Sequence, residues 1–332
     1  MTAYTRIRRP LLNAALSIAC AAIVAAATQP ASAQEWPTRT ITVVVPLGAG
    51  SASDIMARVV MDQVSRQVGQ TVVVENRPGA GGTIGANMVA KSAPDGYTIL
   101  AYGALGTAHA LHGKLPYDTL NDLAPVIPFG VQPLAVTTSP AKGYKTLGDL
   151  VATAKAKPGT INYSSAGVGS ASHFGAERLR VAAGFEAVHI PFKGAAESLN
   201  EIMAARVDFS VQTFTTTLAL IREGKLLPLA VSANKRVSAM PEVPTFIEAG
   251  LPPDSIYPFY SGLFVPAKTP RAVVEKLQQE VAKALQAPPV QARFATLGVE
   301  PMPMTLGEFD KFFRDDVAAA VALVKAAKIQ TQ

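Results

Sequence analysis

Cysteine is nearly absent from this sequence of 332 residues, because Cys20 is the only one. It lies inside an N-terminal segment that we expect to be removed, so the remaining chain would contain no thiol. Disulfide bonds, thiolate catalysis and cysteine-ligated metals are thereby excluded for that chain. A chain of about 300 residues buries enough apolar surface to be stable without disulfide bonds.

Long apolar runs are also scarce, and the only one lies near the N-terminus. Three arginines in the first nine residues precede an uncharged apolar stretch at 11–27, and the small residues Ala-Ser-Ala follow at 31–33. The stretch is shorter than the roughly 20 residues that span a bilayer. This order predicts a signal peptide, 1–33, with cleavage after Ala33 and export to the periplasm.

The chain without its signal peptide carries only a small excess of positive charge. Lys+Arg is 30 and Asp+Glu is 24 in the whole chain, and the signal peptide holds three of the arginines and no acid, which leaves 27 against 24. A basic run interleaved with aromatic residues, as nucleic-acid binding requires, is not found. We therefore expect a soluble monomer that does not bind nucleic acid.

Motifs of named enzyme classes are missing as well. The sequence contains no G-x-G-x-x-G, G-x-x-x-x-G-K-[ST] or G-x-S-x-G motif. His109-x-x-His112 could supply two metal ligands, but no acidic cluster accompanies it. A periplasmic enzyme using His173 or Asp54 as acid or base is an alternative, although no nucleophile and base can be paired. We predict no catalytic activity, no cofactor and no metal site.

Runs of β-branched residues alternate with helical patterns along the rest of the chain, which predicts an α/β fold with largely parallel sheets. Strands are expected at 41–45, 71–74, 97–101, 161–164, 188–192, 209–214 and 227–232, and helices at 54–68, 171–183 and 195–205. Thr269-Pro270 predicts the N-cap and first residue of a C-terminal helix. Thr305-x-x-Glu308 predicts a capping box at the start of the last helix.

This rhythm of strands and helices occurs twice, which predicts two lobes. One lobe would comprise 34–133 and 259–332, and the other 134–258, with the chain crossing near Pro133 and again near 257–262.

Three loops rich in glycine and hydroxyl residues follow expected strands and precede expected helices, at 48–54, 79–83 and 165–170. Glycine lets a ligand approach the main chain, and the first turn of a helix offers unpaired N–H groups and a positive dipole end. Tight turns also use glycine for structural reasons alone, but three such loops from both lobes favour an anion-binding cleft. Asp54 would either have a structural role, capping its helix or pairing with Arg58, or a functional one, holding the loop in shape or contacting a hydroxyl, water or amine of the ligand.

Ordered motifs connect the chain to one family. They include VPLGAGSASDIMAR at 45–58, ENRPGAGGTIG at 75–85, APDGYT at 93–98, KLPYD at 114–118, YSSAGVGSASH at 163–173, HIPFKG at 189–194, VDF at 207–209 and PEVPT at 241–245. Through these motifs the chain resembles the solute-binding proteins of tripartite tricarboxylate transporters, the Bug family. The resemblance covers essentially the whole chain after the signal peptide.

The resemblance implies a two-lobed periplasmic-binding-protein fold of type II, often called a Venus flytrap, with a ligand cleft between the lobes. It also implies capture of a small carboxylate by hinge closure and delivery to a membrane transporter. Presentation of the liganded protein to a sensory receptor is the alternative role.

Carried over position by position, the resemblance implies a set of ligand contacts. The first lobe would supply Ser51, Asp54 and Thr83, with Thr107 as a further wall. The second lobe would supply Ser165, Ala166, Gly167, Gly169, Ser170, His173, Gln212 and Thr213. His173 would be either a wall of the site or a packed, hydrogen-bonded side chain.

The chain departs from the family pattern at three places. Ser51 stands where a second glycine is common, Tyr260-Ser261 where tryptophan is frequent, and Gln212-Thr213 where an acid is common. An acid would suit a ligand ammonium, and glutamine does not supply that charge. We therefore expect an acid without an amine, such as a dicarboxylate, a hydroxy acid or an aromatic acid.

Overall fold

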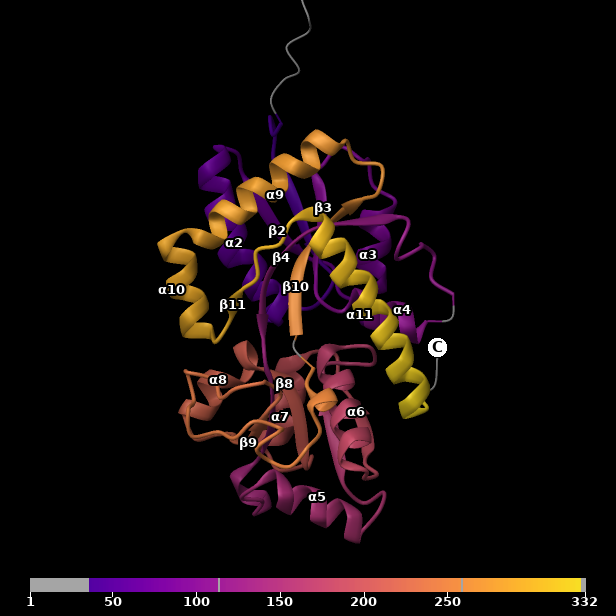
Figure 1. The fold of residues 1–332 in the computed structure, drawn as a ribbon, viewed down its shortest axis with the longest axis vertical. Helices are drawn as coiled ribbons and strands as arrows, with labels where there is room; N and C mark the ends of the chain where they lie inside the picture. Colours follow the sequence, from indigo (N-terminus) through magenta and orange to yellow (C-terminus); the bar gives the residue numbers. More distant parts are fainter. Residues whose placement is uncertain (1–35, 113, 258, 330–332) are drawn as a thin grey trace, which may run out of the picture. The chain divides into compact units, whose positions relative to one another are not determined.

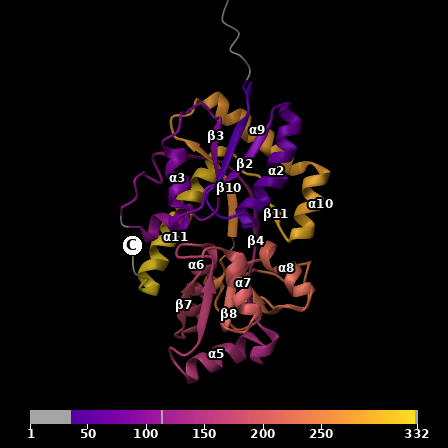
Figure 2. The same ribbon diagram turned by 180° about the vertical axis from the view of Figure 1, so that it is seen from behind.

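The computed structural model describes residues 36–112, 114–257 and 259–329. The predicted signal peptide and its cleavage site lie outside the described residues. Both sheets of the fold belong to one compact unit, Arg39–Gln332, and Figures 1 and 2 show its elements from opposite sides.

The first sheet has six strands, and β1, the last but one in spatial order, is paired on both sides and buried. In spatial order the strands are β11 (Glu300–Pro301), β4 (Leu123–Gln132), β10 (Phe259–Pro266), β3 (Thr98–Tyr102), β1 (Ile41–Val45) and β2 (Val72–Asn76). β1 pairs in parallel with both β2 and β3. Its sequence ITVVV is almost wholly buried, as expected for a β-branched strand covered on both faces.

Helices cover this sheet and, together with it, form what we call the first lobe. They are α2 (Ala52–Val68), α3 (Thr83–Ala90), α4 (Leu105–Leu111), α9 (Arg271–Gln286), α10 (Pro288–Leu297) and α11 (Leu306–Ala327). Helices α2 and α9 lie side by side in both views (Figures 1 and 2). A short 3-10 turn, η1 (Ala80–Gly82), precedes α3.

The second sheet has five strands and, with its helices, forms what we call the second lobe. In spatial order the strands are β7 (Val188–Pro191), β6 (Asn162–Ser165), β8 (Phe209–Thr213), β5 (Leu134–Thr138) and β9 (Leu227–Val231). Its helices are α5 (Leu147–Ala156), α6 (Ala171–Ala183), α7 (Ala195–Met203) and α8 (Phe214–Arg222). Two further 3-10 turns are η2 (Pro140–Lys142) and η3 (Pro253–Ser255).

Both sheets are mixed, whereas the sequence predicts largely parallel sheets. Strand β10 runs antiparallel to β3 and β4, and β5 runs antiparallel to β8 and β9. These antiparallel pairs surround the two passages of the chain between sheets, from β4 through Pro133 into β5 and from β9 back to β10. Strands β5 and β10 each enter their sheet from the other one, without a crossover helix that would make them parallel to a neighbour. The alternation of strands and helices therefore predicted the wrong direction for these two strands. The exact boundaries of the lobes stay a prediction.

The C-terminal helices differ from the prediction at one end. Pro270 is the N-cap of α9 rather than its first residue. The Thr269 hydroxyl donates to the Pro266 carbonyl at 2.7 Å, and no described side chain caps the start of α9. Helix α9 ends at Gln286, and α10 begins almost directly after it, at Pro288. The capping box of α11 is confirmed, because Thr305 and Glu308 each accept a hydrogen bond from the other's backbone N–H.

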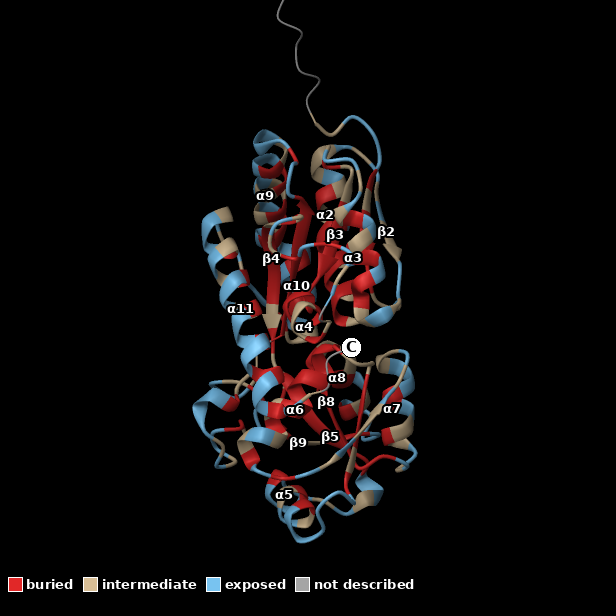
Figure 3. Ribbon diagram, turned by 90° about the vertical axis from the view of Figure 1, so that its right-hand side faces the viewer, coloured by how far each residue is buried: buried red, intermediate tan, exposed pale blue. Residues whose placement is uncertain are grey.

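Aromatic side chains form much of the core of the first lobe. Phe309 and Phe313 of α11 pack against Phe264 of β10, with ring centroids 5.5 and 5.0 Å apart. All three side chains are buried. Figure 3 shows the same pattern along the chain, with the strands buried and the outer faces of the helices exposed.

The second half of α11 packs beyond its own lobe. Leu323 and Val324 belong to one hydrophobic cluster with Leu111 of α4 and Phe174 of α6. Because α4 belongs to the first lobe and α6 to the second, the C-terminal helix contributes to packing between the lobes.

Candidate functional site

A cavity of about 170 Å³ is lined by loops from both lobes. These loops follow β1, β3, β6, β7 and β8, and Phe259 from the start of β10 completes the wall. Ligands in open α/β folds bind at the carboxyl ends of strands, which is where most of these loops lie. The lining residues are Leu47, Gly48, Ala49, Gly50, Ser51, Ala52, Ala104, Ala166, Ser170, Ala171, Ser172, Lys193, Gly194, Ala195, Ala196, Gln212, Thr213, Thr216 and Phe259.

Three helices begin at this cavity with unpaired backbone donors. Ala52 of α2, Ala171 of α6 and Ala195 of α7 occupy the first helical positions and line the cavity. Their N–H groups have no partner among the residues that the structure describes. A helix N-terminus also carries roughly half a positive charge. The cavity therefore offers main-chain hydrogen bonds and a positive potential to an anion.

Helix α8 also begins at the cavity, but its first donors are occupied. The N–H of Phe214 donates to the Pro133 carbonyl at 3.1 Å. The N–H of Thr215 donates to the Gln132 side chain at 2.8 Å. Both acceptors lie at the passage from β4 to β5, so this helix joins the wall of the cavity to the chain segment between the two sheets.

Asp54 holds the loop after β1 in shape and does not line the cavity. Its carboxylate accepts hydrogen bonds from the Gly50 N–H at 2.9 Å and from the Asn76 side chain at 3.0 Å. It also pairs with Arg58 at 2.9 Å, while Asn76 donates to the Leu47 carbonyl at 3.0 Å. Burial alone would raise the pKa of Asp54, but the hydrogen bonds from Arg58, Gly50 and Asn76 outweigh it and lower that pKa. The buried carboxylate therefore fixes both ends of a loop whose residues line the cavity.

Thr107 links the two lobes beside the cavity. Its buried hydroxyl lies 2.8 Å from the Ala104 carbonyl and 2.7 Å from the Gly169 carbonyl, so it donates a shared hydrogen bond. Gly169 belongs to the loop after β6, in the other lobe. Thr83 has a local role instead, since its hydroxyl donates to the Ala80 carbonyl at 2.9 Å.

The lobes also approach each other closely at Gly81. A Cβ atom at this position would lie 2.8 Å from the Val168 carbonyl oxygen, and the φ angle of Gly81 is +61°. Only glycine combines this backbone conformation with this space.

Two stacked histidines support the loop after β6 from behind. The rings of His173 and His189 lie parallel with centroids 4.1 Å apart, and Tyr163 stacks on His189 at 4.8 Å. His173 Nδ1 accepts a hydrogen bond from the Gly169 N–H at 3.2 Å, and His189 Nε2 lies 2.6 Å from the Ser165 hydroxyl. His173 is thus a packed, hydrogen-bonded side chain and not a wall of the cavity.

Acid should weaken the fold through these histidines. Burial lowers the pKa of His173 from 6.5 to about 4. Burial, and then the proximity of His173, lowers the pKa of His189 to about 3. The unfolded chain protonates both rings below about pH 6.5 while the folded chain keeps them neutral, so their contribution to stability is complete above pH 6.5 and falls as the pH drops toward 4.

The measurement is urea unfolding of the wild type and of His189→Gln between pH 7.5 and 4.5. We expect the stability difference between them to change by about 1.4 kcal/mol per pH unit below 6.5, which is the slope for one proton. Asp316 titrates in the same range in the opposite sense, since burial raises its pKa to about 6, and the difference between variants cancels this contribution. A difference that does not vary with pH would contradict the expectation.

The structure brings five of the predicted site residues to the cavity wall, which are Ser51, Ala166, Ser170, Gln212 and Thr213. The other seven surround or support it and do not line it, which are Asp54, Thr83, Thr107, Ser165, Gly167, Gly169 and His173. Sequence reasoning missed the loop Lys193–Gly194 and the start of α7. The signal was available, because an expected strand ends at 192 and an expected helix begins at 195, as in the other loops.

Two further features bear on the kind of site. Within 36–112, 114–257 and 259–329, no cluster of three or more His, Cys, Asp or Glu side chains is placed to hold a metal ion. No helix in the described part of the chain combines the length and apolar character needed to cross a membrane.

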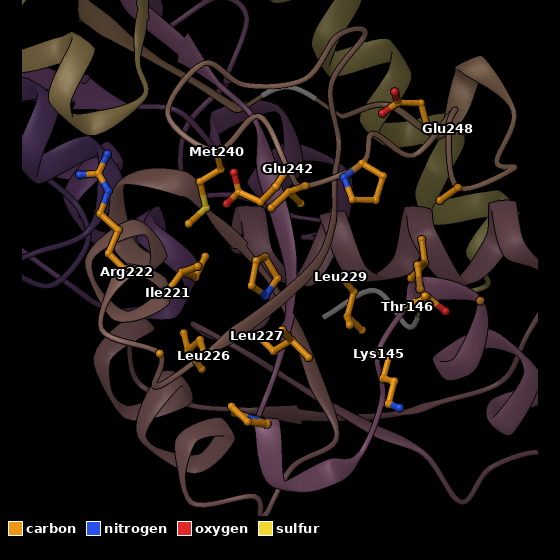
Figure 4. Close-up of a pocket in the computed structure, with 18 of the residues that line it drawn as sticks. Lys145, Thr146, Ile221, Arg222, Leu226, Leu227, Leu229, Met240, Glu242 and Glu248 are labelled. Atoms are coloured by element: carbon orange, nitrogen blue, oxygen red, sulfur yellow. The ribbon is translucent and has the colours of Figure 1, made fainter.

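A larger hollow of about 870 Å³ lies beside the edge strand β9, and all its lining residues belong to 140–249. Figure 4 shows Ile221, Leu226 and Met240 around it, with Arg222 and Glu248 on opposite sides of the view. Helix α5 begins at this hollow, and its capping box places the Asp149 carboxylate in its first turn, where it offsets the positive end of the helix dipole. The hollow thus lacks the meeting of several helix N-termini and the two-lobed wall of the smaller cavity.

Comparisons with known proteins show the family to which the chain belongs. Residues 56–329 match the family described as tripartite tricarboxylate transporter family receptor. BugT of Bordetella pertussis is 33% identical over 299 residues, which cover 89% of this chain and 91% of BugT.

Two solved structures from Rhodopseudomonas palustris are also similar. MatC with bound malate is 30% identical, with a TM-score of 0.82 over 87% of this chain and 100% of MatC. Rpa4515 with adipate is 28% identical, with a TM-score of 0.85 over 89% of this chain and 99% of that one. The predicted α/β, two-lobed fold is confirmed. This chain belongs to the tripartite tricarboxylate transporter receptor family of periplasmic solute-binding proteins, which includes the Bug proteins.

Proposed function

We propose that this protein captures a small carboxylic acid without an amine in the cavity between its lobes. The observation that carries the proposal is the meeting of three helix N-termini with unpaired N–H groups at one cavity. A carboxylate accepts such hydrogen bonds and is stabilised by the positive end of the helix dipole.

The lining of the cavity disfavours a ligand ammonium. None of the described residues that line it is acidic, and the nearby Asp54 carboxylate is already paired with Arg58. Gln212 donates to the Ser198 hydroxyl at 3.0 Å and brings no negative charge to the wall. The malate and adipate in the two similar structures are acids without an amine, which supports the same class for this chain.

Binding would proceed by closure of the two lobes on the ligand. Closure is favoured only if the ligand binds the closed form more tightly than the open form, and contacts from both lobes provide that difference. Ser51 and Ala52 belong to the first lobe, while Ser170 and Ala195 belong to the second. We propose that the closed protein then delivers the acid to a membrane transporter, as the family description indicates.

The test uses the full chain expressed in a bacterial host and purified from its periplasm. The protein is unfolded and refolded to remove carried-over ligand, and thermal unfolding is recorded with a panel of acids and their amino analogues. A ligand at about 100 times its Kd adds about 2.7 kcal/mol of stability, which raises Tm by a few degrees at this size.

We expect shifts with dicarboxylates, hydroxy acids or aromatic acids, and smaller shifts with the amino analogues. Shifts confined to amino acids, sugars or metal ions would contradict the proposal. The mass of the same sample checks the proposed removal of 1–33.

A further inference from the structure

Among the described residues that line the ligand cavity, Lys193 is the only charged one. It is exposed and lies directly before the N-cap of α7. Its backbone N–H donates to the Glu197 carboxylate at 2.9 Å, which fixes the main chain at this point. Lys142 and Lys91 form ion pairs with Asp208 and Asp122, whereas the Lys193 ammonium has no carboxylate partner among the described residues.

The positive charge at the cavity exceeds what one carboxylate would balance. Each of the three helix N-termini contributes roughly half a positive charge, and Lys193 adds a full one. Glu197 has its carboxylate in the first turn of α7, so its negative charge offsets that half charge and about half of the lysine charge as well. The remaining potential is still larger than the single negative charge of a monocarboxylate. A second anionic group on the ligand would restore the balance.

The rest of the wall gives a ligand no other ionic partner. Leu47, Ala104 and Phe259 supply apolar surface, and Gln212 and Thr216 supply neutral polar groups. A monocarboxylate on the helix N-termini would therefore leave the ammonium without a counter-ion in the closed cavity. Partial desolvation of an unpaired ammonium is unfavourable, whereas a hydrogen bond between two charged groups is among the stronger ones in proteins.

We propose that Lys193 is the specificity-determining residue of this receptor, and that it makes the cavity prefer ligands with a second anionic group. The inference rests on the proposed function, because it assumes that the cavity binds a carboxylate. It adds which side chain distinguishes a diacid from the monoacid of the same length.

The experiment compares matched acids by calorimetric titration of the refolded protein. The pairs are succinate with butyrate, glutarate with pentanoate, and adipate with hexanoate. The wild type should bind the diacid of at least one pair more tightly. Lys193→Gln should weaken that diacid about tenfold or more and change the affinity for its monoacid by less than about twofold.

Two further variants make the result specific. Lys193→Arg keeps the charge and should retain most of the preference. Lys155→Gln removes an exposed lysine of α5 that does not line the cavity, and it should change neither affinity.

An equal loss for both members of a pair in Lys193→Gln, or no loss for the diacid, would overturn the assignment. If no acid of any kind binds the wild type, the proposed function itself fails. That result is distinct, because it appears before any variant is tested.

Discussion

Replacing Gly103 by alanine is expected to prevent folding or to destabilise the protein by more than about 4 kcal/mol, at the extreme of single substitutions. Gly103 is buried between β3 and α4. A Cβ atom there would lie 1.9 Å from the Tyr260 carbonyl oxygen and 2.6 Å from the Phe259 ring. Tyr260 belongs to β10, which is paired on both sides, so its backbone cannot move away without breaking the sheet.

The measurement is soluble yield followed by urea unfolding. Gly307→Ala is the matched control, since no atom lies within 4 Å of the added Cβ in the first turn of α11. It should leave stability unchanged or raise it by up to about 1 kcal/mol, because alanine is the better helix former. A Gly103→Ala protein as stable as this control would show that β3 and β10 are less tightly packed than described.

The second large effect is expected for Asp54→Asn. The amide replaces one carboxylate oxygen by an NH2 group, which would face either the Gly50 N–H or the Arg58 guanidinium, where the carboxylate now accepts hydrogen bonds. We expect a loss of about 2 kcal/mol in stability, as for hydrogen bonds to charged groups. We also expect at least about a tenfold loss in ligand affinity, since the residues from Leu47 to Gly50 line the cavity.

A matched control lies in the same helix. Asp62 also pairs with an arginine four residues later, Arg66, but both side chains are more than half exposed. Asp62→Asn should change stability by less than about 1 kcal/mol and leave affinity unchanged. Urea unfolding and titration with the acid that gives the largest thermal shift measure both effects. Equal affinities in the two variants would mean that the loop after β1 does not depend on Asp54.

Local signals in the sequence predict the elements around the site closely. The strand at 41–45 and the helix at 171–183 have the predicted bounds, because burial patterns and N-cap residues act within a few positions. Strand direction around the two passages was not predictable in this way, since it depends on which sheet β5 and β10 join. The helix α10 was also missed, because Pro288 can both stop one helix and begin the next.

For the candidate site too, the sequence predicts roles that depend on nearby residues better than roles that depend on contacts across the fold. The resemblance indicated Ser51 and Ser170, and both begin helices at the cavity. It also indicated Thr107 and His173, which act one layer behind the wall through contacts made across the fold. Lys193 carries the only charge among the described residues of the wall. Its proposed role depends on having no carboxylate partner among the described residues, and a sequence does not show which charges are paired.

The packing of α11 against both lobes has a practical consequence for measuring binding. Two chain segments alone would let the lobes both rotate and twist relative to each other. Because α11 packs against residues of both lobes, it restricts this movement to fewer directions. The last turn of α11 lies at this contact, where Arg180 of α6 donates to the Ala327 carbonyl at 3.0 Å. If the lobes close on the ligand as proposed, a fluorophore attached near this turn would lie where they move against each other, so the C-terminal helix is a suitable place for an optical reporter of ligand capture.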